Sequence, residues 1–65
     1  MPANDKAILV YTTFPSAEAA EAVGGALVEA GLVACANIIP GMVSIYVWRG
    51  ERAREQEVVM LLKTT

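Results

Sequence analysis

Cys35 is the only cysteine in this sequence, and its sulfur is a soft ligand atom of the kind found in copper sites. A thiolate suits Cu(I), so Cys35 is a candidate ligand for copper or another metal cation. Its neighbours Ala34 and Ala36 support a second interpretation, in which Cys35 is a small residue of low reactivity in the core of a sheet. One sulfur does not make a selective site, so a copper site would need several copies of the chain.

Tyr46, Trp48 and Lys63 form a second candidate site, for a small molecule. Tyr46 and Trp48 are two residues apart, so they share one face of a predicted strand and could line a cleft between subunits. The alternative is that they pack in an interface, where aromatic residues are enriched. Lys63 could bind an anion in the same cleft or pair with a carboxylate. Both interpretations of the aromatic pair, as the lining of a cleft or as interface packing, predict contact between copies of the chain.

The sequence lacks the arrangements that are typical of catalysis. There is no histidine to activate Cys35, and the carboxylates fall on an exposed helix face or in a predicted hairpin. Gly24 and Gly25 lie inside a predicted helix and not in a phosphate-binding loop. We therefore expect that the protein is not an enzyme.

The composition points to self-association. Hydrophobic residues make up 55% of a 65-residue chain, which is more apolar material than one small domain hides. One cysteine excludes an internal disulfide, and without histidine or a Cys-x-x-Cys motif a structural zinc site has too few ligands. Residues 1–65 therefore read as a single domain that is stabilised by binding to itself.

The net charge of the chain disfavours nucleic acid and membranes as partners. The net charge is −2, and no cluster of lysine and arginine is present, so we expect neither nucleic acid nor a membrane as partner. The start of the chain, MPANDK, does not resemble a secretory leader. We expect a cytoplasmic protein, because a lone thiol stays reduced there.

The hydrophobic periodicity predicts four elements that position these residues. A strand is expected over 7–13, and a helix over 16–30 with Ser16 as its cap and Gly31 as its stop. A long strand follows over 33–48, bent at Pro40-Gly41, and a last strand covers 56–64 after a charged, solvated tip at 51–57. The expected buried stripe of the helix contains Ala20, Val23, Gly24, Leu27 and Ala30.

The order β-α-β-β predicts an α/β (α+β) fold, a ferredoxin-like split β-α-β with an antiparallel sheet whose third strand inserts between the first two. The two pieces of the bent strand span about 50 Å, so part of the hairpin should project beyond the domain. In this fold a second helix and a fourth strand follow. Because strand 7–13 is an uncharged open edge without them, we expect the domain to be incomplete at its C-terminus.

Three motifs resemble those of the CutA family of divalent-cation tolerance proteins, and the similarity runs from Ile8 to Thr65. They are L-x-A-C-x-N-I-x-P-G from Leu32, S-I-Y-x-W-x-G from Ser44 and E-V-x-x-x-x-K-T from Glu57. The resemblance implies a homotrimer that pairs long strands across subunits, an architecture similar to the PII signalling proteins, and a role in the response to metal ions. Family members are typically longer than this chain.

The resemblance also implies copper binding, which has been proposed for some members of the family. Those members carry a cysteine at a position that corresponds to Thr12 here, together with C-terminal histidines, so a copper site of that type is not complete in these residues. Two alternatives stay open: a PII-like regulator that binds a small anionic molecule near Trp48 and Lys63, and a trimeric scaffold without a ligand.

Overall fold

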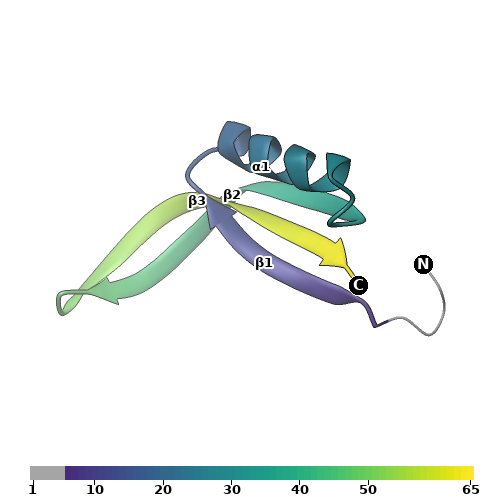
Figure 1. Ribbon diagram of the computed structural model, residues 1–65. Helices are drawn as coiled ribbons and strands as arrows, with labels where there is room; N and C mark the ends of the chain where they lie inside the picture. The colour runs from purple at the N-terminus through teal and green to yellow at the C-terminus, as the bar shows by residue number, and fades with distance from the viewer. Residues whose placement is uncertain (1–5) are drawn as a thin grey trace.

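The computed structural model describes residues 6–65, and the chain forms the predicted order of strand, helix, strand, strand (Figure 1). The elements are β1 (Ile8–Phe14), α1 (Ala17–Glu29), β2 (Cys35–Trp48) and β3 (Glu51–Thr64). The sheet order is β1-β3-β2, with both pairs antiparallel. The α+β class, and the insertion of the last strand between the first two, are confirmed.

The ends of α1 form as the sequence predicts. The Ala19 amide donates to Ser16 Oγ over 3.1 Å, which satisfies one of the free N–H groups of the first turn. At the other end Gly31 takes the left-handed conformation with φ 72°, a conformation that costs glycine little. No helix in the described part of the chain has the length and apolar character needed to cross a membrane.

The buried stripe of α1 is narrower than predicted. Ala20 and Gly24, one turn apart, are buried, but Val23 is 42% exposed and Ala30 is also exposed. A single helix touches a sheet along one line, and Val23 lies about 100° around the axis from Gly24. The prediction of Val23 and Ala30 as core residues is therefore wrong for the single chain.

The long hairpin bends where the sequence predicts a bulge. The register of β2 against β3 shifts between Ile39 and Met42, and Gly41 has φ 80°. Beyond the bend the hairpin runs away from the helix and forms one end of a molecule that measures 46 × 25 × 17 Å (Figure 1). We call residues 42–57 the arm, and the rest of the folded chain the body.

Two strand boundaries differ from the prediction. β3 begins at Glu51, directly after the turn, and not at residue 56 as predicted, so the charged and largely exposed segment 51–55 belongs to the strand. Arg49 and Gly50 both have positive φ, 52° and 79°, as in a two-residue type I′ turn, whose twist keeps the strands paired up to the turn. β2 begins at Cys35, two residues later than predicted.

The core lies between α1 and the body of the sheet. Its buried residues are Ala20, Val58, Met60 and Leu62. Partly buried apolar residues surround them: Phe14, Ala17, Leu27, Val33, Ala36 and Ile38. The described elements leave the opposite face of the sheet and the edge at β1 uncovered, as Figure 1 shows.

Candidate functional site

Cys35 lies on the sheet face that points away from α1. Along β2 it alternates with Ala36, which packs on the core, so the two side chains point to opposite faces. Cys35 is half-buried, and its thiol donates to Asn37 Oδ1 over a sulfur–oxygen distance of 3.9 Å. In the single chain Cys35 therefore lies outside the core between α1 and the sheet, and its assignment as a ligand or as a core residue of an assembly stays a prediction.

The surroundings of Cys35 in one chain do not suit a metal cation. Lys63 is the direct neighbour of Cys35 on β3, so an ammonium group lies on the same face. Among residues 6–65 no group of three or more histidine, cysteine or acidic side chains is close enough to hold a metal ion. One thiol and one amide oxygen beside a positive charge are too few donors, so a metal site here requires further copies of Cys35.

Tyr46 and Trp48 share one face of the arm, as predicted. Hydrogen bonding to Glu55, with smaller contributions from desolvation and from the charges of Glu55 and Glu57, raises the pKa of the Tyr46 phenol. The Arg49 guanidinium lies over the Trp48 ring, 5.7 Å from the ring centroid, within the range of a cation–π contact. Sequence reasoning missed the two glutamates because their positions depend on the register of the hairpin.

Lys63 and the aromatic pair lie at opposite ends of the molecule. Lys63 faces Cys35 at one end of β2, and Trp48 faces Glu51 at the other. The 14 residues of β2 extend over roughly 45 Å, close to the longest dimension of the chain, 46 Å. A cleft that contains Lys63 and Trp48 therefore has to form between two copies.

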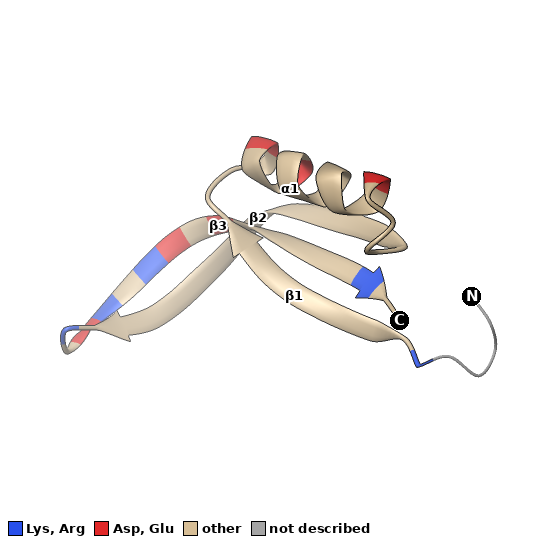
Figure 2. Ribbon diagram, in the orientation of Figure 1, with Lys and Arg blue, Asp and Glu red and all other residues tan. Residues whose placement is uncertain are grey.

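The register sorts the side chains of the arm into two different faces. One is an acidic-aromatic face, which comprises Met42, Ser44, Tyr46, Trp48, Glu51, Ala53, Glu55 and Glu57. The other is a basic-aliphatic face, which comprises Val43, Ile45, Val47, Arg52, Arg54 and Gln56. Figure 2 shows that acidic and basic residues are interspersed along the distal part of β3.

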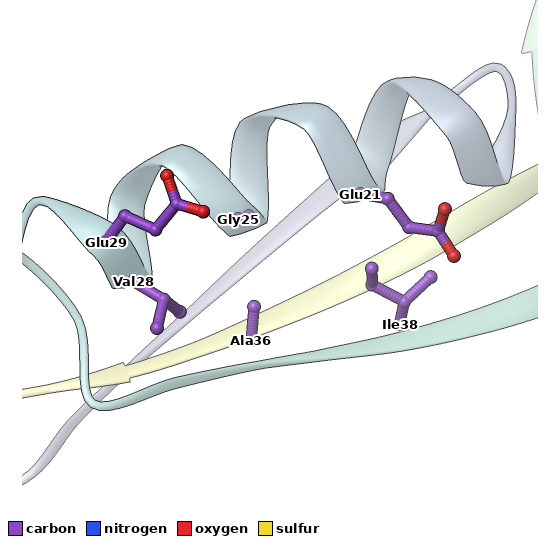
Figure 3. Close-up of a pocket in the computed structure, with 7 residues that line it drawn as sticks. Glu21, Gly25, Val28, Glu29, Ala36 and Ile38 are labelled. Carbon is purple, nitrogen blue, oxygen red and sulfur yellow. The ribbon is translucent and has the colours of Figure 1, made fainter.

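An open groove runs between α1 and β2 (Figure 3). Its volume is about 290 Å³, and its apolar lining includes Val28, Ala36 and Ile38. Two carboxylates lie at its ends, Glu21 beside Ile38 and Glu29 beside Val28. The helical spacing places both glutamates on the polar face of α1, but the groove could not be predicted because the position of β2 was unknown.

Comparison with known proteins gives one consistent family. Residues 8–65 match the sequence model of a family described as CutA1 divalent ion tolerance protein. A curated relative, the divalent-cation tolerance protein CutA of Thermus thermophilus, is 51% identical over 57 residues, which are 88% of this chain and 55% of the relative. The chain thus spans about half the length of the relatives it matches.

Solved structures share the fold as well as the sequence. The crystal structure of divalent ion tolerance protein CutA1 from Ehrlichia chaffeensis superposes with a TM-score of 0.87 at 40% identity, over 97% of this chain and 59% of that one. A structure from Archaeoglobus fulgidus, described as a periplasmic divalent cation tolerance protein CutA, gives a TM-score of 0.81 at 37% identity. It is matched over 91% of this chain and 57% of that protein.

Proposed function

This chain belongs to the CutA1 divalent ion tolerance family, and we propose that it acts in the tolerance of divalent metal ions as an assembly of identical copies. The match over residues 8–65 is the observation that carries this proposal. The metal-tolerance role is carried over from relatives that are about twice as long. A direct test is the growth of cells in toxic copper when the gene is deleted and when it is restored.

Exposed apolar side chains support self-association, and the resemblance implies that the assembly is a homotrimer. They occur along β1 and on both faces of the arm, and they include Leu9, Tyr11, Ile45, Val47 and Trp48. Exposed apolar surface of this extent typically marks an interface. Analytical ultracentrifugation should give three times the 6.9 kDa mass of the chain, and a monomer at every concentration would contradict the proposal.

Cys35 is the residue that we propose as a copper ligand of the assembly. Its half-buried thiol on the uncovered face of the sheet supports the proposal, since copies that pack through this face would bring thiols together. Titration of the reduced protein with Cu(I) against a competing chelator should give binding that is lost in Cys35→Ala. Stoichiometric Cu(I) binding that survives this substitution would show that another residue is the ligand.

A PII-like regulator is the second candidate function. Its proposed residues, Lys63 and Trp48, lie at opposite ends of one chain, so a site that uses both would have to form in a cleft between two copies. Trp48 is the only tryptophan, so its fluorescence reports on the arm. Quenching by nucleotides but not by copper would favour this function, the reverse would favour metal binding, and no response to either would favour a scaffold without a ligand.

We also propose that the protein is not an enzyme, binds neither nucleic acid nor membranes, and works in the cytoplasm. The net charge of −2 and the single cysteine support the last three points. The Archaeoglobus relative is described as periplasmic, so the compartment has to be measured for this protein. Cell fractionation with an antibody against the chain would decide it.

A further inference from the structure

The groove between α1 and β2 is apolar in the middle and acidic at its two ends (Figure 3). Its helix side is a stripe of residues at spacings of three and four, which comprises Glu21, Gly24, Gly25, Val28 and Glu29. Its floor is formed by Ala36 and Ile38, which are two residues apart on β2 and pack toward the helix. This distribution complements a molecule that is positively charged at both ends and apolar between them.

The middle of the groove has room for an alkyl chain. A Cβ placed on Gly25 would meet nothing within 4 Å, so the helix backbone itself is open to a ligand there. The volume of about 290 Å³ corresponds to about ten water molecules. A methylene group is similar in size to a water molecule, so a chain of about eight methylenes with two end groups matches this volume.

No lysine or arginine of the described residues lines the groove. The arginines all belong to the arm, and Lys63 lies on the sheet face that points away from the helix. Glu29 is the last residue of α1, and the last turn contains no basic residue, so its carboxylate lies at the negative end of the helix dipole. A cation bound at this end would offset two unfavourable terms, the dipole and the charge of Glu21 along the same helix.

We propose that this groove binds a linear aliphatic diamine or polyamine. One terminal ammonium group pairs with Glu21 and the other with Glu29, while the alkyl chain lies on Val28, Ala36 and Ile38. The helical rise separates the two glutamates by about 12 Å along the axis. An extended chain of about eight methylenes separates its two terminal nitrogen atoms by about 11 Å, so one molecule spans both carboxylates.

Other classes of ligand fit the groove less well. One metal ion cannot contact two carboxylates that are about 12 Å apart. An uncharged alkyl chain leaves both carboxylates without a partner, and an anion is repelled by both. Recognition at both ends therefore predicts that affinity depends on the second amino group and on the length of the chain between the two.

Nuclear magnetic resonance of the full chain with isotope-labelled glycine tests the proposal. The chain has five glycines, of which Gly25 lines the groove, whereas Gly41 and Gly50 lie in the bend and in the turn of the hairpin. Titration with α,ω-diaminooctane should shift the Gly25 signal in a saturable manner and leave the signals of Gly41 and Gly50 in place. Octylamine should bind more weakly by roughly threefold, and magnesium chloride at equal ionic strength should not shift Gly25.

Substitution of the two glutamates identifies the groups that bind. Glu21→Gln and Glu29→Gln should each raise the dissociation constant of α,ω-diaminooctane by roughly threefold, and the double substitution by roughly tenfold. Glu18→Gln is the matched control, because Glu18 lies on the same helix but outside the groove, and it should leave the dissociation constant unchanged. Circular dichroism confirms that each variant is folded.

Three results would overturn the proposal. The first is a Gly25 signal that the diamine does not shift, which includes the case of a groove covered by another copy of the chain. The second is equal binding of octylamine, and the third is binding that survives the double substitution. None of these results bears on metal tolerance or on self-association, which the growth assay and ultracentrifugation measure separately.

Discussion

The strands β2 and β3 pair with each other in both the body and the arm, yet only the body has a core. On β3 in the body, Val58, Met60 and Leu62 are at most 7% exposed. On the corresponding face of the arm, Val43, Ile45 and Val47 of β2 are 41%, 55% and 74% exposed. Strand pairing continues through both regions, but only in the body does β1 pair with β3 and does α1 cover the sheet (Figure 1). Pairing of two strands orders the backbone, but further elements are needed to bury the side chains.

This contrast supports the proposed contact of the arm with a second copy. A two-stranded hairpin is marginally stable in water, and the arm has apolar side chains on both faces. Its twist and register are set by the turn at Arg49-Gly50, but the described chain offers no surface that covers it. We therefore expect substitutions in the body to change the stability of the fold, and substitutions in the arm to change self-association.

The largest expected effect comes from Met60, which is fully buried. Met60→Ala should lower the free energy of unfolding by about 2–5 kcal/mol, because it removes packed atoms and leaves a cavity. Val47→Ala in the arm should cost less than about 0.5 kcal/mol in dilute protein. Urea denaturation at low and high protein concentration measures both, and the cost of Val47→Ala should rise with concentration if a second copy covers the arm. If the two substitutions lowered the free energy of unfolding equally at low protein concentration, the contrast between the body and the arm would be refuted.

The two central glycines of α1 provide a matched pair within the body. A Cβ at Gly24 would lie 2.8 Å from Met60 Sδ and 3.1 Å from Ala36 Cβ, whereas a Cβ at Gly25 meets nothing within 4 Å. Gly24→Ala should therefore destabilise the protein by about 1–3 kcal/mol through overpacking. Gly25→Ala should stabilise it by up to about 1 kcal/mol through helix propensity. Thermal unfolding monitored by circular dichroism compares them, and equal shifts in Tm would show that α1 does not pack on the sheet through Gly24.

The sequence predicted most of the body because its local signals agree with one another. Ser16, Gly31 and the Pro40-Gly41 bend are each set by short-range backbone chemistry, and all three occur where expected. The burial of Gly24 was also predicted, from its place on the apolar stripe. Val23 was misassigned because the width of a buried stripe depends on how much sheet lies beneath the helix, which no local pattern contains.

The candidate sites were harder to predict because each depends on register. Cys35 looked like a core residue from its alanine neighbours, but alternation along β2 turns it to the uncovered face. The segment 51–55 looked like a solvated tip from its charges, although Arg52 and Arg54 recur at every second position, which is also the pattern of a strand with two different faces. The proposed cleft with Trp48 and Lys63 would depend on contacts between copies, which no local sequence pattern encodes.

A smaller effect is expected at the turn of the arm. Arg49 has φ 52°, a left-handed conformation that is unfavourable for residues other than glycine and asparagine. Arg49→Asn creates the Asn-Gly pair preferred in type I′ turns, and should stabilise the hairpin by about 0.5 kcal/mol after loss of the cation–π contact with Trp48. Hydrogen exchange should show greater protection of arm amides and no change in the body. Arg49→Lys keeps the positive charge and the strained conformation, so it should not increase the protection of the arm amides.

The smallest expected effect is the titration of Tyr46, which reports on the acidic-aromatic face of the arm. Its pKa is raised above the usual 10.0 by the hydrogen bond and charge of Glu55, so the folded chain holds the phenol proton more tightly than the unfolded chain does. This contribution to stability is complete below pH 10.0 and is lost as the pH rises through the folded pKa.

Glu55→Gln should lower the pKa of Tyr46 toward 10.0, as measured by ultraviolet difference spectroscopy in a Tyr11→Phe background, where Tyr46 is the only tyrosine that titrates. Glu51→Gln, on the same face but absent from the groups that act on Tyr46, is the control and should leave the titration unchanged. If Glu55→Gln also leaves it unchanged, Tyr46 and Glu55 do not share a face in solution. The register that divides the arm into an acidic-aromatic and a basic-aliphatic face would then be wrong, and Arg52 and Arg54 would lose their common face as well.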